Sequence, residues 1–436
     1  MGCQMNEYDS DYLGQTLVNS GFIPTKSPKN ADLILINTCT IRAKAEQKAF
    51  SLIGRMIPLK KRNPGLILGI TGCIAQQEGS NLMKRFPDLD LVLGTREIFR
   101  FKEIVNRIYV NREKVVCTDI DLKTLPPVNT NSYFMNRVKS YISIMQGCNN
   151  FCSYCIVPYV RGREISRSPD DILQEAKHLV SQGVKEITLL GQNVNSYCWR
   201  EKKETAFPLL LKKLNKLEGL RRIRFTTSHP KDISDELIRC YSDLHNLCAH
   251  IHLPFQAGSN KILRLMNRGY TREKYLELIY KLRDARPDIS ITSDVMVGFP
   301  AETDEDFLMT LDLIKKIQFD GLFSFKYSDR KGTMAAKMEG KIEENEKSVR
   351  LTSLQQLQKG ITQQKNKMLE GMEMEILVEG NSKKCGQLTG RTCTNKIVNF
   401  NCNNSMINNL VNVKIERSFA NSLWGKLSDN ISFSGK

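Results

Sequence analysis

Three cysteines lie within eight residues near the middle of the chain: Cys148, Cys152 and Cys155. Three clustered thiolates can bind three irons of a cubane iron–sulfur cluster and leave the fourth iron open to a small molecule, whereas closed clusters use four Cys. The alternative is a structural zinc site, which needs four ligands and usually recruits a second Cys or His pair at short spacing. The nearest His, His178, lies inside a predicted helix farther along the chain. The spacing therefore favours an open iron–sulfur cluster.

A second set of cysteines is spread over the N-terminal part of the chain: Cys3, Cys39 and Cys73. Cys39 and Cys73 each follow an apolar strand directly, and ligands bind at the carboxyl edge of open α/β sheets. Separated Cys are more often buried small residues than ligands. The shared placement and the presence of another triad favour a second site. The other seven of the thirteen cysteines are interpreted as small apolar or surface residues.

The N-terminal triad is carried by a segment in which helical and strand patterns alternate, residues 1–117. Its apolar strands are predicted at Leu33–Ile36, Leu66–Ile70 and Leu91–Leu93. The alternation indicates an α/β domain with a mainly parallel sheet. Residues 118–137, which include Pro126 and Pro127, interrupt the pattern and are predicted to be a linker.

Strands and helices alternate again over residues 138–370, in about six units, which predicts a partial or complete parallel TIM-type (β/α)6 barrel. The central cysteines follow its first strand, Tyr141–Met145, at the carboxyl end where barrel enzymes keep their active sites. The last helix of the series is predicted at Asp304–Ile317, with Thr303 and Asp306 as a capping pair. Further strands are predicted at Ile187–Leu190, Ile223–Thr226, Ala249–Leu253, Ile289–Val297 and Gly321–Tyr327.

The last part of the chain, residues 371–433, changes character. Short alternating segments such as Met374–Val378, Ile397–Phe400 and Leu410–Ile415 predict a small antiparallel β-barrel. Its basic residues would suit contacts with an RNA backbone, although a solvated surface is the competing interpretation. These residues are Lys383, Lys384, Arg391, Lys396, Lys414 and Arg417.

The composition limits the class of protein. A formal net charge of +17 is compatible with a polyanionic partner, or with solubility alone. No apolar run approaches the roughly 20 residues of a membrane-spanning helix, so no membrane association is expected. The N-terminus has neither the basic nor the apolar region of an export signal, which predicts a cytoplasmic protein. In that compartment, cysteines more often bind metals or do chemistry than form disulfides.

Six sequence segments together resemble the methylthiotransferase family, and the CxxxCxxC spacing resembles the signature of the radical S-adenosylmethionine (SAM) superfamily. The resemblance implies an N-terminal methylthiotransferase domain, a radical SAM barrel and a C-terminal TRAM domain that binds RNA. In that family the first Cys ends a leading strand, whereas two residues precede Cys3, so either the start codon is misassigned or the sheet lacks an edge strand. The segments are Gly2–Asn6, Asn37–Arg42, Gln146–Cys155, Pro158–Arg163, Thr226–Pro230 and His252–Ser259.

The resemblance also implies ligands and pocket residues. Cys148, Cys152 and Cys155 would hold the 4Fe-4S cluster that cleaves SAM, and Cys3, Cys39 and Cys73 an auxiliary 4Fe-4S cluster that carries the transferred sulfur. Gly191, Gln192 and Asn193 stand where superfamily members contact the SAM amino group. Gln256, Ser259 and Val297 are further candidates for the SAM pocket, although each could be ordinary turn chemistry. The basic segment 161–167 is a candidate for contacts with tRNA phosphates or SAM, or an ordinary exposed loop.

The activity implied by the family uses two SAM molecules per turnover, one as the source of a 5′-deoxyadenosyl radical and one as the methyl donor. Gln4–Asn6 and Thr226–Pro230 favour the branch that converts N6-isopentenyladenosine, expected at position 37 of the anticodon loop, to its 2-methylthio derivative. The partners would be the tRNA anticodon stem-loop, a low-potential electron donor such as flavodoxin or ferredoxin, and a sulfur source or cluster-assembly proteins. A monomer is expected.

Three other functions remain open on the sequence. Sister methylthiotransferases act on threonylcarbamoyl-adenosine in tRNA or on a side chain of a ribosomal protein. A protein of another class would bind zinc at its cysteines, read RNA with its β tail and have no catalytic activity. Metal analysis separates the last alternative from the enzymes, because iron clusters and zinc sites differ in both metal and stoichiometry.

Overall fold

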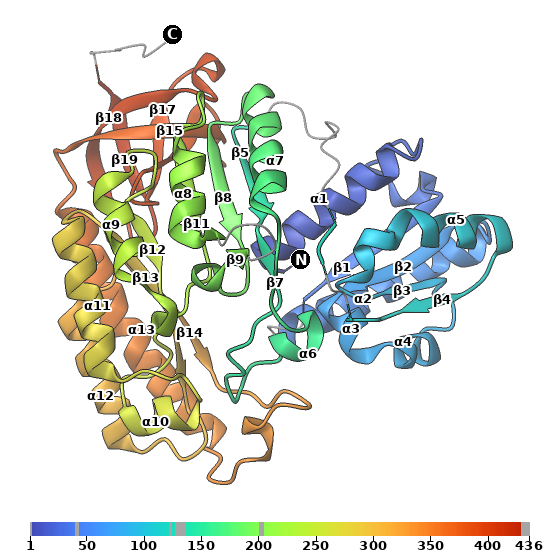
Figure 1. Cartoon of the computed structure of the whole chain (residues 1–436), viewed down its shortest axis with the longest axis horizontal. Coiled ribbons are helices and arrows are strands. Elements are labelled where there is room, and N and C mark those ends of the chain that lie inside the picture. The colour runs from blue at the N-terminus through green and yellow to red at the C-terminus, as the bar shows by residue number, and fades with distance from the viewer. Residues whose placement is uncertain (1, 40–42, 122–123, 127–136, 200–204, 429–436) are drawn as a thin grey trace.

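The computed structural model describes residues 2–39, 43–121, 124–126, 137–199 and 205–428. An N-terminal α/β domain lies beside a central barrel, and a small C-terminal barrel packs on one end of the central one (Figure 1). Most of the predicted linker, with Pro127, lies outside the described residues, as do residues 40–42 of one recognised segment and residues 429–433 at the end of the predicted tail. No helix in the described part is long and apolar enough to cross a membrane.

The N-terminal domain is built on a parallel sheet, as predicted, with four strands in the order β1-β2-β3-β4, the last of which is not among the predicted strands. Helices cover both faces, and separate apolar clusters lie on the two sides of the sheet. β2 is buried along its whole length, which explains why it reads as a continuous apolar run. The strands are β1 (Leu33–Thr38), β2 (Ile67–Gly72), β3 (Leu91–Leu93) and β4 (Val115–Cys117). The helices are α1 (Gln4–Val18), α2 (Ala43–Arg62), α3 (Cys73–Glu78), α4 (Ser80–Arg85) and α5 (Phe101–Asn111).

Six parallel strands form the central barrel, in two groups of three, β5-β8-β11 and β12-β13-β14. A parallel bridge between Ile223 and Leu247 joins the two groups, while β5 and β14 have no mutual pairing among the described residues. The barrel is therefore partial. The strands are β5 (Lys139–Ser143), β8 (Glu186–Leu190), β11 (Arg222–Phe225), β12 (His250–His252), β13 (Ser290–Val297) and β14 (Gly321–Lys326).

The helices of the central barrel cover its outside and enclose one large apolar core with the strands. α12 has the predicted bounds, and its first turn carries the capping box of Thr303 and Asp306 that the sequence indicates. The covering helices are α7 (Pro169–Ser181), α8 (Phe207–Asn215), α9 (Asp235–Asp243), α11 (Arg272–Ala285), α12 (Asp304–Ile317) and α13 (Glu344–Lys367). Shorter elements are β6 (Met145–Gln146), α6 (Val157–Arg161), β7 (Ile165–Ser166), β9 (Cys198–Trp199), β10 (Thr205–Ala206) and α10 (Asn260–Leu265).

A five-stranded closed barrel ends the described chain, with strand order β15-β16-β17-β19-β18. All of its pairings are antiparallel except β17 with β19, which run parallel. Apolar residues alternate along its strands and fill its centre. The strands are β15 (Glu373–Asn381), β16 (Gln387–Thr392), β17 (Ile397–Asn401), β18 (Leu410–Ser418) and β19 (Leu423–Leu427).

The C-terminal barrel packs against the amino-terminal ends of the central strands. Arg224 on β11 donates hydrogen bonds to the carbonyl oxygens of Thr392 (2.7 Å) and Cys393 (3.0 Å) in the β16–β17 turn. Lys139, the first residue of β5, pairs with Glu379 at 2.8 Å. The carboxyl ends of the central strands, where the cysteine loop begins, therefore face away from the C-terminal barrel.

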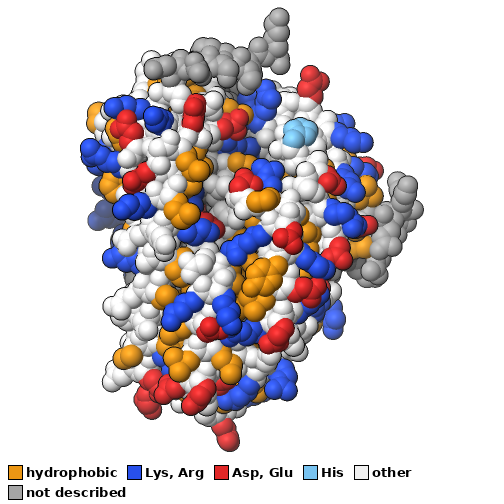
Figure 2. Space-filling model, turned by 90° about the vertical axis from the view of Figure 1, so that its left-hand side faces the viewer, with side chains coloured by type: hydrophobic (Ala, Val, Ile, Leu, Met, Phe, Trp, Pro, Cys, Tyr) orange, Lys and Arg blue, Asp and Glu red, His pale blue; other side chains and the backbone are white. Residues whose placement is uncertain are grey.

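Surface charge is mixed on the side formed by the central barrel and the C-terminal barrel. Figure 2 shows Lys and Arg interspersed with Asp and Glu across that face. The positive excess of the sequence is not gathered there into one patch, so charge on this side alone does not locate a polyanion site.

Candidate functional site

The central cysteine triad lies on the loop that leaves β5 and β6, as the sequence predicts. The loop is fixed at both ends, because the Cys148 N–H donates to the Gly162 carbonyl (3.1 Å) and the Ser153 N–H to the Met266 carbonyl (3.0 Å). Gly147 has φ +83°, and a side chain there would meet the Arg163 carbonyl at 2.1 Å, so glycine is required for this path. The fold thereby holds three thiols together at the carboxyl end of the first strand.

Burial and mutual repulsion both act on these thiols. Burial, with a smaller contribution from the neighbouring cysteines, raises the pKa of Cys148 to about 11 and that of Cys155 to about 12. Three thiolates crowded in this way need compensating positive charge, and irons would supply it. The donor set therefore fits an iron–sulfur cluster.

Cys152, the most buried of the three, has two further neighbours, of which the sequence indicates His229, by its place at a strand end, but not Arg268. Arg268 lies 3.4 Å from its sulfur through Nη1 and is itself buried, and His229 lies 4.0 Å away through Nε2. Burial lowers the pKa of His229 to about 2, so this imidazole is neutral at physiological pH. The arrangement favours a pocket-lining role for His229, while Arg268 supplies a fixed positive charge.

The N-terminal triad is also brought together. Cys3 precedes α1, Cys39 follows β1, and Cys73 begins α3 after β2. The Cys3 and Cys39 thiols are hydrogen-bonded to each other, which with the charge of Arg161 lowers the pKa of Cys3 to about 6. Burial raises the pKa of Cys73, and the Arg161 guanidinium lies against that thiol. Three cysteines distant in sequence therefore meet at the carboxyl edge of the N-terminal sheet.

Helix α6 links the two triads, because it begins just after Cys155 and ends with Arg161 beside Cys3 and Cys73. Arg161 Nη2 donates to Asp9 Oδ2 on α1 at 2.6 Å. Ile156 and Val160 pack against Cys73. Asp9 Oδ1 and Arg161 Nη1 are buried and make no hydrogen bond, although both residues lie beside the triad. The second donor set therefore also fits a charged, buried group.

Ligand spacing distinguishes a cluster from a single ion. Among the described residues, no group of three or more His, Cys, Asp or Glu is arranged to hold one metal ion. A cubane cluster needs a wider spacing of ligands than a single ion, because each thiolate binds a different iron atom of the cluster.

The Gly191–Asn193 segment follows β8 and is bonded to the central cysteine loop. Gln192 Oε1 accepts from the Gly147 N–H at 2.5 Å. Asn193 Nδ2 donates to Asp232 Oδ2 at 2.7 Å, and the same oxygen is 3.4 Å from Asn150 Nδ2. A side chain at Gly191 would meet Met145 Cγ at 2.5 Å. These residues therefore hold the loop in place, whatever else they bind.

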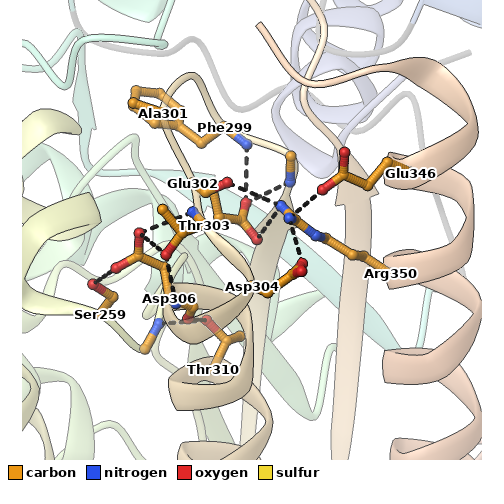
Figure 3. Close-up of polar contacts among 12 residues, drawn as sticks. Ser259, Phe299, Ala301, Glu302, Thr303, Asp304, Asp306, Thr310, Glu346 and Arg350 are labelled. Carbon is orange, nitrogen blue, oxygen red and sulfur yellow. Dashed lines mark hydrogen bonds and ion pairs between the residues drawn. The ribbon is translucent and has the colours of Figure 1, made fainter. Parts of the chain in front are cut away.

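Gln256, Ser259 and Val297 lie near the carboxyl ends of β12 and β13, at the same end of the barrel. Gln256 has φ +67° and pairs with Val295 through its backbone. Val297 is fully buried at the end of β13. The Ser259 hydroxyl is buried and donates to Asp306 at 2.5 Å (Figure 3). The Ser259 hydroxyl is thus used in a hydrogen bond within the central barrel. Any contact between Ser259 and SAM would therefore be made by the Ser259 backbone.

A charged cluster fixes the Gly298–Phe299 turn that follows β13 (Figure 3). The Glu302 carboxylate accepts from the N–H groups of Gly298 (2.5 Å) and Phe299 (3.0 Å). Arg350 on α13 pairs with Glu302 at 3.4 Å and with Asp304 at 2.9 Å. A helix far along the sequence thus sets the position of a turn at the mouth of the barrel.

Three buried polar side chains near the same strand ends have atoms without hydrogen-bond partners: Gln146, Asn193 and Ser228. Buried polar atoms are nearly always satisfied, so each such atom calls for a ligand or water. Their placement, with Gln146 at the end of β6, Asn193 after β8 and Ser228 after β11, fits a polar ligand such as the amino-acid or ribose part of SAM.

The basic segment 161–167 differs from a simple exposed loop. Arg161 pairs with Asp9, and Arg167 pairs with Glu175 at 2.7 Å, all four being buried. Among its three arginines, only Arg163 is exposed. The interpretation of the whole segment as a phosphate contact is therefore wrong, because two of its three guanidinium groups are used inside the protein.

A groove of about 880 Å³ runs along the outside of the C-terminal barrel. Four of the six predicted basic residues line it, together with the aromatic rings of Phe419 and Trp424. These four are Lys383, Lys384, Arg391 and Arg417. Lys396 lies instead in a second cavity, of about 670 Å³, between this barrel and α13, where its ammonium group is 3.4 Å from Asp320. Basic and aromatic side chains in one groove are typical of single-stranded nucleic-acid binding.

Three family profiles match the chain in its three parts. The Radical SAM superfamily matches residues 142–314, Uncharacterized protein family UPF0004 matches residues 1–94, and the TRAM domain matches residues 367–428.

Full-length relatives are similar over nearly the whole chain. The tRNA-2-methylthio-N(6)-dimethylallyladenosine synthase of Syntrophus aciditrophicus is 51% identical, over 98% of this chain and 93% of that protein. The enzyme of the same name from Geobacter sulfurreducens is 47% identical, over 98% and 96%. Among solved structures, the radical S-adenosylmethionine methyltransferase TsrM from Kitasatospora setae has a TM-score of 0.56 at 15% identity, covering 73% of this chain and 72% of that one. The last similarity concerns the fold alone.

Proposed function

Because this chain belongs to the family of tRNA-2-methylthio-N(6)-dimethylallyladenosine synthases, we propose that it replaces the hydrogen on carbon 2 of N6-dimethylallyladenosine in tRNA with a methylthio group. The observation that carries the proposal is the pair of cysteine triads joined by α6. One triad alone would suit many radical SAM reactions, whereas a sulfur insertion needs a second place from which sulfur is delivered.

Each triad has a separate task in this proposal. Cys148, Cys152 and Cys155 hold the 4Fe-4S cluster to which SAM binds, and Cys3, Cys39 and Cys73 hold the auxiliary 4Fe-4S cluster. Bound together, the clusters and two SAM molecules supply one-electron cleavage, sulfur and a methyl group, chemistry that no side chain provides. The chain's own residues orient these groups and exclude water.

The surrounding residues position the ligands. Gln192 and Asp232 fix the central cysteine loop, and Arg268 compensates the charge next to Cys152. Gln146, Asn193 and Ser228 offer unused polar atoms to SAM, with the backbone of Gln256, Ser259 and Val297 completing the pocket. The target base must leave the stack of its loop to reach this pocket, which is easiest in single-stranded RNA.

The proposed function also assigns a role to each domain and implies the partners. Residues 1–117 carry the auxiliary site, residues 138–370 the SAM site, and residues 371–433 an RNA-binding barrel. The partners are the anticodon stem-loop of tRNA, a low-potential electron donor such as flavodoxin or ferredoxin, and a sulfur source or cluster-assembly protein. The enzyme acts as a monomer in the cytoplasm, where its tRNA is.

The test is the nucleoside content of tRNA in a strain that lacks the gene, measured by mass spectrometry. Complementation uses the wild type, Cys152→Ala, Cys39→Ala and, as a matched control, Cys385→Ala, which changes an exposed cysteine of the C-terminal barrel. The 2-methylthio nucleoside is expected to disappear in the mutant strain, its precursor to accumulate, and only wild type and Cys385→Ala to restore it.

Three outcomes would change the proposal. An unchanged 2-methylthio-N6-isopentenyladenosine level would reject the substrate and favour threonylcarbamoyl-adenosine or a ribosomal protein. Restoration by Cys39→Ala would reject the role of the auxiliary triad while leaving the central one intact. Zinc in place of iron in the anaerobically purified protein would favour the non-catalytic alternative.

A further inference from the structure

An aromatic pair projects from the protein beside the central cysteines. Phe151, between Cys148 and Cys152, is 36% exposed, and Tyr159 on α6 is 49% exposed. Their rings meet edge to face, with centroids 6.5 Å apart and an interplanar angle of 86°. The guanidinium carbon of Arg163, also exposed, lies 5.6 Å from the centre of the Phe151 ring. Two rings and one cation thus form a single surface at the rim of the site.

The backbone below Phe151 is held in an unusual conformation. Its φ is +46°, which is uncommon for any residue with a side chain and costly for a bulky one. Asn267 Nδ2 donates to the carbonyl oxygens of Phe151 (3.1 Å) and Asn150 (3.4 Å), which fixes this path. The neighbouring Ser153 donates through its hydroxyl to the Leu265 carbonyl at 2.8 Å. The protein therefore tolerates local strain to point an apolar ring outward.

Exposure of a single aromatic ring needs no explanation, so the arrangement has to be compared with other exposed rings. Tyr280 on α11 is 53% exposed and makes no ring contact among the described residues. Phe151 differs because it has a ring partner, a cation and a fixed backbone, all next to cysteines that lie at the mouth of the barrel. Unpaired RNA bases stack on aromatic side chains and on Arg guanidinium groups, in surfaces of this composition.

We propose that Phe151, Tyr159 and Arg163 form a stacking platform for an unpaired base next to the modified adenosine, so that they position the anticodon loop over the reactive centre. This inference rests on the proposed function and extends it, because it assigns the RNA contact closest to the chemistry. The groove of the C-terminal barrel lies at the opposite end of the central strands and would bind the RNA farther from the target base.

The experiment uses the anaerobically reconstituted full-length enzyme and an anticodon stem-loop RNA with N6-dimethylallyladenosine. One neighbouring loop nucleotide is replaced by 2-aminopurine, whose fluorescence is quenched by stacking. Binding affinity and quenching are measured for the wild type, Phe151→Ala, Tyr159→Ala and Phe151→Trp. Tyr280→Ala is the control for loss of an exposed ring.

Loss of one stacking ring is expected to weaken binding by a factor between roughly 5 and 150 and to restore the fluorescence. Phe151→Trp is expected to regain both affinity and quenching, which a merely structural role would not require, and Tyr280→Ala to behave as wild type. If Phe151→Ala fails to assemble its iron, Tyr159→Ala, which lies outside the cysteine loop, still tests the platform.

The experiment distinguishes failure of the stacking platform from failure of the proposed tRNA substrate. If the wild type binds the stem-loop with quenching and both alanine variants do the same, the platform is rejected and the proposed function stands. If the wild type binds no stem-loop RNA at all, the tRNA substrate itself is rejected, and the platform with it.

Discussion

Arg161 and Asp9 form a buried ion pair, 2.6 Å from Nη2 to Oδ2, that connects the two cysteine triads. Arg161 ends the helix that follows Cys155, and Asp9 lies on the helix that follows Cys3. The pair therefore fixes the N-terminal domain against the central barrel between the two triads, where the proposed function requires the sulfur donor and the radical centre to meet. Breaking this pair should destabilise the protein more than breaking a surface pair, because the charged group left behind would be buried and could not be hydrated.

Arg161→Met should disrupt the N-terminal site. Removing one partner leaves Asp9 charged and buried, which costs about 3–5 kcal/mol, and it removes the cation beside Cys3 and Cys73. In a Cys148→Ala/Cys152→Ala/Cys155→Ala background, iron bound after reconstitution is expected to fall from about four per chain towards zero. Arg107→Met, which breaks an exposed pair with Glu113, is the control and should keep the iron. Full iron in the Arg161 variant would contradict this role.

Glu302 should make stability depend on pH. Burial raises its pKa to about 7, although the Arg350 charge opposes this shift. Between the ordinary pKa of 4.5 and this value the folded protein binds more protons than the unfolded chain, so the free energy of unfolding should fall as pH rises through that window. Glu302→Gln, which cannot titrate, should flatten the fall. Urea unfolding at several pH values between about 5 and 7 measures both proteins, and equal slopes would reject the assignment.

Local patterns are enough to predict most of the elements that position the site. Cys39 and Cys73 are predicted at a sheet edge because each follows an apolar run, and β1 and β2 do end beside them. The bounds and capping box of α12 can be read from Thr303, Asp306 and the apolar period. These features depend on residues a few positions apart, which is the range over which sequence patterns carry structural information.

Pairings across domains cannot be predicted in the same way. Arg161 reads as one more basic residue of a polar loop, and its partner Asp9 is 152 positions away. Arg268 looks like an ordinary helix-end cation, although it lies against Cys152. Burying such charges is favourable only when the tertiary fold supplies a partner, and no local signal records that partner. Arg161 therefore shows why the sequence alone suggests a surface role for the basic segment.

Arg224 should hold the C-terminal barrel in place. It is buried, pairs with Glu186 at 3.0 Å and donates to two carbonyl groups of the β16–β17 turn. Arg224→Met would remove the ion pair of Glu186 and both hydrogen bonds across the interface, and would leave the Cys393 carbonyl without its donor, so the interface should open. Limited proteolysis is expected to release a C-terminal fragment earlier than in wild type. Arg239→Met, an exposed arginine on α9, should leave the digestion pattern unchanged.

The groove of the C-terminal barrel should contribute to RNA affinity without affecting the chemical step. Lys383 and Lys384 would neutralise phosphates, and Trp424 would stack a base, at the end of the central barrel that faces away from the cysteines. A double Lys383→Ala/Lys384→Ala variant should weaken stem-loop binding. It should also make affinity less dependent on salt, with the slope of log affinity against log salt reduced by about 0.7 for each phosphate that is no longer neutralised. Trp424→Ala should weaken binding by about 1–3 kcal/mol with the slope unchanged.

Turnover at saturating RNA distinguishes this role from the one assigned to Phe151. Because the groove lies far from the target base, its variants are expected to raise KM and leave kcat near the wild-type value. Lys102→Ala, an exposed lysine on α5 in the N-terminal domain, is the charge-matched control for one lysine and should change neither constant. A fall in kcat with unchanged affinity would contradict this division of roles and would place the groove residues in the positioning of the base.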